Sequence, residues 1–201
     1  MKLYYARGAC SLSPHIVLCE GGFDYQLEKT DLKTKKTESG QDYLAINPKG
    51  YVPALQLDSG EILAEGPAIV QYLADQKPDA RLAPKAGSMA RYHLQEMLNF
   101  ISTEIHKQYG LLYNSQVPEA QKNLSLEALK RRYAYLAEIL QGKTYLFGED
   151  FSVADAYLFT VTSWAKFLKL DLSPWPTIQQ YQERIAARPA VQRAMKEEGL
   201  L

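Results

Sequence analysis

The pattern of hydrophobic and polar positions differs between the first 80 residues and the rest of the chain. In the first part, short apolar runs alternate with helical periodicity and are separated by glycine, proline and a turn at Asp58-Ser59-Gly60. The predicted elements are strands at residues 2–6, 25–30, 54–57 and 61–64 and helices at residues 12–20, 40–46 and 67–76. Their order, β-α-β-α-β-β-α, predicts a small mixed sheet with helices.

After this part the texture changes. Residues 77–88 (KPDARLAPKAGS) contain two prolines and a glycine, which is typical of a linker. From residue 88 onward the apolar positions follow helical periodicity, and no stretch favours a strand. Helices are predicted at residues 88–113, 118–141, 152–168, 176–187 and 190–198. We therefore predict an α/β domain at residues 1–80 followed by an all-helical domain at residues 81–201.

The helix predicted at residues 88–113 has two distinct faces. Its apolar face is formed by Leu94, Met97, Ile101, Ile105 and Leu112. The opposite face presents Asn99, Thr103, His106 and Gly110. This stripe is either a solvated surface or the wall of a polar cleft, and its lack of acids and lysines favours the cleft.

Composition and charge exclude some classes of function. Apolar residues make up 46% of the 201 residues, which is enough for a substantial core. Lys and Arg together number 23, as do Asp and Glu, so no attraction to nucleic acid or to an anionic membrane is expected. No basic and apolar leader and no long apolar run is found, so we expect a cytoplasmic protein.

The few cysteines and histidines do not indicate a metal site or a disulfide framework. Cys10 and Cys19 are expected to remain thiols in a reducing compartment. With the three histidines they do not form the paired spacings typical of zinc sites, so no metal is expected. Cys19 lies in a predicted helix next to Ile16, Val17 and Leu18, which is typical of a buried structural thiol.

Cys10 lies in the stretch GACSLSPH, just before the first predicted helix. The unsatisfied N–H groups and the dipole of a helix N-terminus favour the thiolate, so this thiol is a candidate for chemistry. The alternative is a small buried structural thiol. Ser13 stands where a dithiol oxidoreductase has its second cysteine, so Cys10 can form a mixed disulfide with a ligand thiol but cannot close an internal disulfide.

Two further stretches suggest a peptide-like ligand. A cis Val52-Pro53 bond would leave the N–H and C=O groups of Val52 available to an extended peptide, whereas a trans bond would make Pro53 an ordinary strand-entry proline. In Glu65-Gly66-Pro67, the helix N-terminus can bind a carboxylate and Glu65 can bind an ammonium group. The alternative is that Glu65 only favours the dipole of its own helix. Together with Cys10, these stretches indicate a site for a zwitterionic peptide that carries a thiol.

The whole chain resembles the cytosolic glutathione transferases, and most closely the bacterial beta class. The motifs that carry the resemblance are GACSLSPH, NPKGYVPAL, EGPAIVQYLAD, FSVADAYLF and RPAVQRAM. The resemblance implies a thioredoxin-like N-terminal domain that binds glutathione, the cosubstrate. It also implies a homodimer whose helical domain supplies the pocket for a small hydrophobic electrophile and part of the dimer interface.

The resemblance also assigns roles to individual residues. Cys10 is expected beside the glutathione sulfur and Lys35 at the glycyl carboxylate. Val52, held by Pro53, is expected to pair with the cysteinyl backbone, and Glu65 with Gly66 to hold the γ-glutamyl end. The expected contacts from the helical domain, some of which can cross the dimer interface, come from Asn99, Thr103 and His106.

This chain departs from better-known relatives at two points. Gly66 stands where many relatives have Ser or Thr, so only its backbone N–H remains for the γ-glutamyl carboxylate. Other classes activate the thiol with a Tyr or Ser hydroxyl, whereas here Tyr5, Cys10 and His106 are all candidates.

The resemblance implies a glutathione transferase that conjugates glutathione to hydrophobic electrophiles in detoxification. One alternative is glutathione-dependent thiol-disulfide exchange or reductive dehalogenation through Cys10. Another is a non-catalytic protein that binds hydrophobic ligands. Ser152 and Asp155 have the spacing of a capping box with a structural role, and three aromatic residues are expected in the core: Phe159, Trp164 and Phe167.

Overall fold

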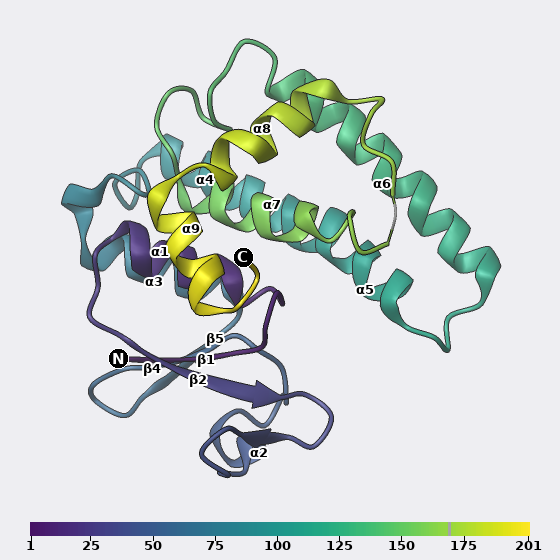
Figure 1. The fold of residues 1–201 in the computed structure, drawn as a ribbon. Helices are drawn as coiled ribbons and strands as arrows, with labels where there is room; N and C mark the ends of the chain where they lie inside the picture. The colour runs from purple at the N-terminus through teal and green to yellow at the C-terminus, as the bar shows by residue number, and fades with distance from the viewer. Residues whose placement is uncertain (169) are drawn as a thin grey trace. The chain divides into compact units, whose positions relative to one another are not determined.

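The chain divides into two compact units in a computed structural model, which describes residues 1–168 and 170–201 (Figure 1). The first unit comprises Met1–Ala83 together with Ala187–Leu201, and the second comprises Pro84–Ala186. The first unit holds the sheet, and the second is helical, which confirms the predicted fold class. Among the described residues, no helix has the length and apolar character needed to cross a membrane.

The sheet of the first unit has five strands in the order β3-β2-β1-β4-β5. Their bounds are β1 (Lys2–Tyr5), β2 (Gln26–Asp31), β3 (Lys36–Thr37), β4 (Ala54–Gln56) and β5 (Ile62–Ala64). β1 runs parallel to β2, and the other neighbouring pairs are antiparallel. In the central strand β1 both Leu3 and Tyr4 are buried, so both faces of the sheet are covered there.

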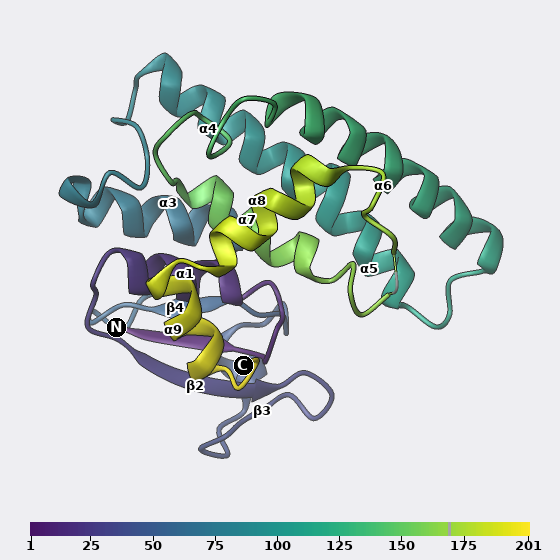
Figure 2. The same ribbon diagram turned by 45° about the horizontal axis from the view of Figure 1, so that its top comes forward.

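Helices cover the two faces of this sheet. In the first unit they are α1 (Leu12–Glu20), α2 (Tyr43–Ile46), α3 (Gly66–Gln76) and α9 (Pro189–Glu197), with a 3₁₀ turn at Pro78–Ala80. α1 packs against both α3 and α9, and α1 and α9 lie side by side in both views (Figures 1 and 2). Tyr43 of α2 packs on the opposite face, where its ring centroid is 5.8 Å from that of Tyr4.

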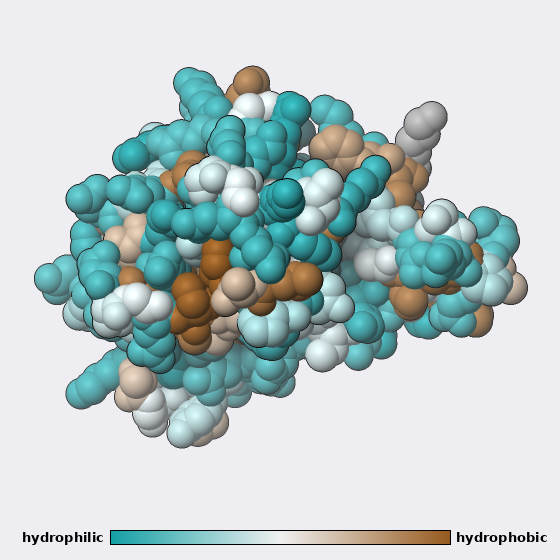
Figure 3. Space-filling model, turned by 90° about the horizontal axis from the view of Figure 1, so that it is seen from below, coloured by the Kyte–Doolittle hydropathy of each residue, from teal (hydrophilic) through white to brown (hydrophobic). Residues whose placement is uncertain are grey.

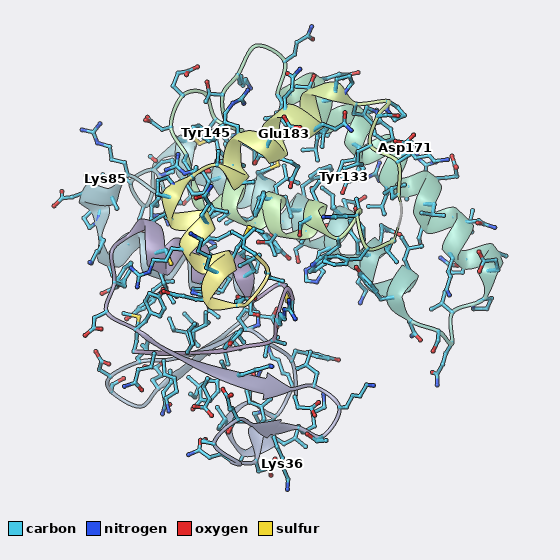
Figure 4. All side chains as sticks on the ribbon, viewed as in Figure 1. Lys36, Lys85, Tyr133, Tyr145, Asp171 and Glu183 are labelled. Carbon is cyan, nitrogen blue, oxygen red and sulfur yellow. The ribbon has the colours of Figure 1, made fainter. Side chains whose placement is uncertain are left out.

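The second unit is built from helices around a buried central one. Its helices are α4 (Met89–Phe100), a π-helical turn (Ile101–His106), α5 (Lys107–Tyr113), α6 (Glu119–Ile139), α7 (Val153–Ser163) and α8 (Pro176–Ala186). α7 is buried over almost its entire length, which explains its apolar sequence. Tyr133 of α6, labelled in Figure 4, is fully buried, and its hydroxyl lies 2.7 Å from that of Tyr109.

Some predicted elements differ from the observed ones. The two-residue strand β3 was not predicted, and Lys36 at this strand is solvent-exposed (Figure 4). The helix predicted from residue 40 begins at Tyr43, because the Asp42 side chain accepts the Leu44 N–H as its N-cap. The helix predicted at residues 152–168 ends at Ser163. As a result, Phe167 lies outside the core with 65% exposure, whereas Trp164 and Phe159 are buried as expected.

The structural interpretation of Ser152 and Asp155 is confirmed. Asp155 is fully buried, and its carboxylate accepts hydrogen bonds from the N–H and hydroxyl of Ser152 at 2.8 and 2.7 Å. It also accepts the Leu146 N–H and the Tyr181 hydroxyl, both at 2.9 Å. This carboxylate therefore joins the start of α7 to α8 and to the preceding loop.

Candidate functional site

Cys10 lies in the short loop that connects β1 to α1. The Ser11 hydroxyl holds this loop, because it accepts the Ala6 N–H at 3.1 Å and donates to the Ala6 carbonyl at 3.2 Å. The Cys10 thiol donates to the carbonyl of Val52, with Sγ 3.1 Å from the oxygen. Ser13 donates to the backbone carbonyl of Cys10 at 3.0 Å, so its hydroxyl is not directed at the thiol.

The electrostatics of Cys10 correct the expectation of a thiolate. Burial raises the pKa of the Cys10 thiol to about 12, and the negative charges of Glu65 and Glu198 contribute in the same direction. The backbone N–H groups of Cys10 and Ser11 lower this pKa, as a helix start should, but burial outweighs them. Without a ligand, Cys10 is therefore a neutral thiol and a hydrogen-bond donor at neutral pH.

The Val52-Pro53 peptide bond is cis, which decides between the two alternatives left open by the sequence. The Val52 carbonyl faces the Cys10 thiol, and no residue that the structure describes accepts a hydrogen bond from the Val52 N–H. Gly66 lies near the same bond, because a Cβ added to it would be 3.9 Å from both the Pro53 ring and the Ser13 hydroxyl. Cys10, Val52, Pro53 and Gly66 are thus gathered at one place in the first unit.

Charged side chains flank this place. Lys35 donates from Nζ to the Gly50 carbonyl at 2.9 Å, two residues before Val52. Glu65 has a φ of 73°, and its side chain makes no capping hydrogen bond to α3. Instead it accepts a hydrogen bond from Lys49 at 2.6 Å, with both side chains more than half exposed. The sequence did not indicate Lys49 as a site residue, because a loop sequence does not show which carboxylate a lysine side chain will contact.

Tyr5 faces a different environment from Cys10. Its ring centroid lies 6.4 Å from that of His15 in α1. Burial raises the pKa of the Tyr5 hydroxyl, with further contributions from Glu198 and Glu38. Among the described residues, no hydrogen bond joins this hydroxyl to Cys10. The structure thus gives Tyr5 no hydrogen bond to the thiol.

The remaining candidates lie in the second unit. Asn99 and Thr103 are exposed, and the Thr103 hydroxyl donates to the Asn99 carbonyl at 3.0 Å. His106 is half-buried at the end of the π-helical turn, and its Nδ1 lies 2.7 Å from the hydroxyl of Tyr157 in α7. The ring centroid of Trp164 lies 4.9 Å from that of the imidazole in an edge-to-face arrangement.

Tyr157 and Trp164 were not predicted as site residues. Both are buried. Trp164 was expected in the core and Tyr157 was given no role, because no signal in the sequence distinguished an aromatic residue that holds His106 from one that only fills space. A π-helical turn contains one extra residue, and this changes which side chains share a helix face.

Comparison with known proteins gives a consistent result over the whole chain. Residues 1–75 match the family described as "Glutathione S-transferase, N-terminal domain" and residues 94–189 match "Glutathione S-transferase, C-terminal domain". The chain is 46% identical over 200 residues to "Glutathione S-transferase GstA" of Escherichia coli O157:H7, with complete coverage of both sequences.

Solved structures show the same similarity. A sphingomonad glutathione S-transferase complexed with glutathione is 45% identical, with a TM-score of 0.96 and complete coverage of both chains. The beta-class glutathione S-transferase of Sphingomonas chungbukensis is 46% identical, with a TM-score of 0.96 and the same coverage.

Proposed function

Since the chain belongs to the glutathione S-transferase family, we propose that its first unit binds glutathione with the glutathione sulfur beside Cys10. The thiolate of the bound glutathione then attacks small hydrophobic electrophiles. The observation that carries this proposal is the contact between the Cys10 thiol and the Val52 carbonyl next to a cis proline. These groups combine a sulfur-directed donor with backbone groups that suit an extended peptide.

The charges around this contact suit the two ends of glutathione. The ligand carries a carboxylate at its glycyl end and both a carboxylate and an ammonium group at its γ-glutamyl end. Lys35 supplies a cation close to Val52, and Glu65 supplies an anion at the start of α3. We assign Lys35 to the glycyl carboxylate, Glu65 to the ammonium group, and the Gly66 N–H to the γ-glutamyl carboxylate.

Ligand binding would change the partner of the Cys10 thiol. In the structure this thiol donates to the Val52 carbonyl at 3.1 Å. A glutathione sulfur placed beside it becomes a better acceptor once ionised, because a charge-assisted hydrogen bond is stronger. The Val52 carbonyl is then available to the cysteinyl N–H of glutathione. Cys10 thus lowers the pKa of the glutathione thiol by donating a proton in a hydrogen bond and forms no covalent bond.

The helical unit supplies the second part of the proposal. Asn99 and Thr103 are exposed at the end of α4 and in the π-helical turn that follows it, and His106 is the last residue of this turn. We assign His106 to a hydrogen bond with the forming thiolate or to relay of its proton. Figure 3 shows hydrophobic residues gathered in places on one face of the molecule. Catalysis in this proposal combines thiolate stabilisation with proximity.

We also propose that the protein is a cytoplasmic homodimer. The second unit exposes large apolar side chains on α4 and α6, which include Met89 at 67%, Tyr92 at 54%, Leu124 at 64% and Tyr135 at 49%. Covering such side chains against a second copy would remove them from water. Cys10 and Cys19 are both free thiols, which suits a reducing compartment.

Turnover of a chromogenic electrophile panel with glutathione tests the proposed chemistry. We expect conjugation by the native protein, with the apparent pKa of bound glutathione below that of free glutathione. The variant Cys10→Ala should raise this apparent pKa because it removes the S–H donor. Trapping of a covalent Cys10–glutathione intermediate during conjugation would contradict the proposal. Light scattering at several protein concentrations tests the dimer.

A further inference from the structure

A second cluster of reactive side chains lies in the first unit, where α1 meets the start of β2 and the end of α9. It consists of His15, Cys19, Tyr25, Glu197 and Glu198. The sulfur of Cys19, a ring nitrogen of His15 and a carboxylate oxygen of Glu197 all lie within 4.8 Å of one another. Imidazole, thiolate and carboxylate are the three ligand types that zinc takes in proteins.

Two of the three candidate ligands lie close together along the chain. His15 and Cys19 are four residues apart on α1 and therefore point to the same side of the helix. Glu197 is 182 positions from His15 and reaches the cluster because α9 packs against α1. The fold thus completes a ligand set that no local motif contains.

The imidazole of His15 is oriented as in many metal sites. Its Nδ1 lies 3.0 Å from a carboxylate oxygen of Glu198, and both side chains are fully buried. The other oxygen of Glu198 accepts the Gly8 N–H at 2.8 Å, so this carboxylate is fixed in turn. His15 therefore directs Nε2 at Glu197, whose oxygen is 2.8 Å away. A carboxylate behind a metal-binding histidine fixes the ring orientation and raises its basicity.

The hydroxyl of Tyr25 contacts all three candidate ligands. Its hydroxyl lies 2.6 Å from Oε2 of Glu197, 3.0 Å from the sulfur of Cys19 and 3.4 Å from Nε2 of His15. The second oxygen of Glu197 accepts a hydrogen bond from Arg193 at 2.8 Å, so Oε2 is the oxygen that faces the cluster. The Tyr25 oxygen thus lies beside the nitrogen, sulfur and oxygen atoms, in the position that a fourth ligand would take.

We propose that His15 Nε2, Cys19 Sγ and Glu197 Oε2 form a zinc-binding site, with a water that displaces the Tyr25 hydroxyl as the fourth ligand. All three side chains bind in their deprotonated forms, so binding releases the thiol proton and any proton on His15 Nε2, and no electron is transferred. The Tyr25 hydroxyl keeps its proton, moves aside and donates its hydrogen bond to the thiolate instead of the carboxylate. The site joins α1 to α9, so zinc would stabilise the folded first unit.

The test uses Co²⁺ as a spectroscopic probe and Zn²⁺ for affinity, on full-length protein carrying Cys10→Ser. This background removes the thiol of the glutathione site, so a thiolate-to-cobalt absorption band can come only from Cys19. Three further substitutions are compared in it: Cys19→Ser, Glu197→Gln and His93→Gln. The last is the matched control, because His93 and Glu96 form an exposed pair 3.1 Å apart on α4.

We expect one equivalent of Co²⁺ with a thiolate band and tetrahedral ligand-field bands in the background protein. The band should vanish with Cys19→Ser, and Glu197→Gln should weaken Zn²⁺ binding by about 10- to 100-fold or more, as loss of even an outer-shell partner does. Zn²⁺ should raise the melting temperature of the background protein, and His93→Gln should change none of these results. Absence of the band from the background protein, its persistence in Cys19→Ser, or its loss with His93→Gln would overturn the proposal.

Discussion

At the scale of single residues, Cys10 shows that a helix start does not by itself produce a reactive thiolate. The two backbone N–H groups act in the direction that the sequence predicts, but burial and two nearby carboxylates act against them. The result is a neutral thiol whose pKa is raised to about 12. Before glutathione binds, this raised pKa keeps Cys10 protonated at neutral pH, and Cys10 is therefore a poor nucleophile.

Reaction of Cys10 with oxidised glutathione should therefore be slow at neutral pH and accelerate with pH. Because the thiolate is the nucleophile, the rate should rise about tenfold per pH unit between pH 7 and 9 without a plateau. Intact-mass measurement gives the rate. Cys10→Ala should abolish the modification and leave glutathione binding largely intact, whereas Cys19→Ala serves as the control and should still be modified. A plateau near pH 8 would contradict the raised pKa.

Glu65 provides a second test at this scale. Its carboxylate accepts from Lys49 at 2.6 Å, so it is already held at the position where we place the ligand ammonium group. Glu65→Gln keeps the shape but removes the charge, and should cost roughly 1.5–3 kcal/mol of glutathione affinity. Calorimetry measures this, with Glu61→Gln on the exposed hairpin as control. Equal affinities of the native protein and Glu65→Gln would leave Glu65 no role in binding.

The sequence predicted some residues of this site better than others. Val52, Pro53 and Gly66 belong to contiguous motifs in which the backbone itself forms the site, and the structure places them together. Lys49 became apparent only from the structure, because its role depends on a contact with a residue 16 positions away. The pKa of Cys10 was predicted in the wrong direction, since burial depends on the whole fold and not on the local motif.

At the scale of elements, the π-helical turn between α4 and α5 determines where His106 lies. Helical periodicity correctly predicted a long helical segment, and Leu94, Ile101 and Ile105 are buried as expected. It did not predict the extra residue of the turn at Ile101–His106. His106 consequently contacts Tyr157 and Trp164 instead of continuing the exposed stripe of Asn99 and Thr103.

His106→Ala should raise the kinetic pKa of bound glutathione and lower kcat if the imidazole assists the thiolate. Tyr157→Phe tests how the ring is held, because it removes only the hydroxyl 2.7 Å from Nδ1. We expect a fall in kcat with little change in KM and a smaller shift of the pH-rate profile than in His106→Ala. The exposed His93→Gln is the control. An unshifted profile in His106→Ala, accompanied by a lower melting temperature, would make His106 a structural residue.

Asp155 links three elements, so its removal should affect stability and not chemistry. Asp155→Ala leaves the Ser152 N–H, the Leu146 N–H and the Tyr181 hydroxyl without their buried acceptor. We expect a loss of about 3 kcal/mol or more of unfolding free energy. Denaturant titration measures it, and the exposed Asp171→Ala is the comparison. A loss no larger than that of Asp171→Ala would show that the buried carboxylate is dispensable.

At the scale of the whole molecule, the chain returns at its end to the unit where it began. Ala187–Leu201 clusters with Met1–Ala83, although its sequence has the same helical character as the segment before it. Periodicity along the chain identifies the apolar face of α9 but does not show which element packs against that face. The return of the chain to the first unit could therefore not be predicted from it. The contact of α9 with α1 is also what assembles the proposed zinc ligands.

An ion pair at this return gives the last prediction. Arg188, just before α9, donates from Nε and a terminal nitrogen to the two oxygens of Glu20 at 2.6 and 2.9 Å. The Arg188 and Glu20 side chains are only 27% and 11% exposed, so Arg188→Ala would leave a largely buried carboxylate without this partner. We expect a loss of about 1.5–3 kcal/mol of unfolding free energy.

The matched control is Lys130→Ala, which breaks an ion pair with Glu127 in which both side chains are more than half exposed. Such exposed pairs contribute little to stability, so the melting temperature should change little. For Arg188→Ala, a chain of this length should lose roughly 2–4 °C of melting temperature per kcal/mol. Calorimetry should show the loss first in the transition of the first unit, because α9 belongs to that unit. An equal and small effect of both substitutions would mean that apolar packing alone holds α9 against α1.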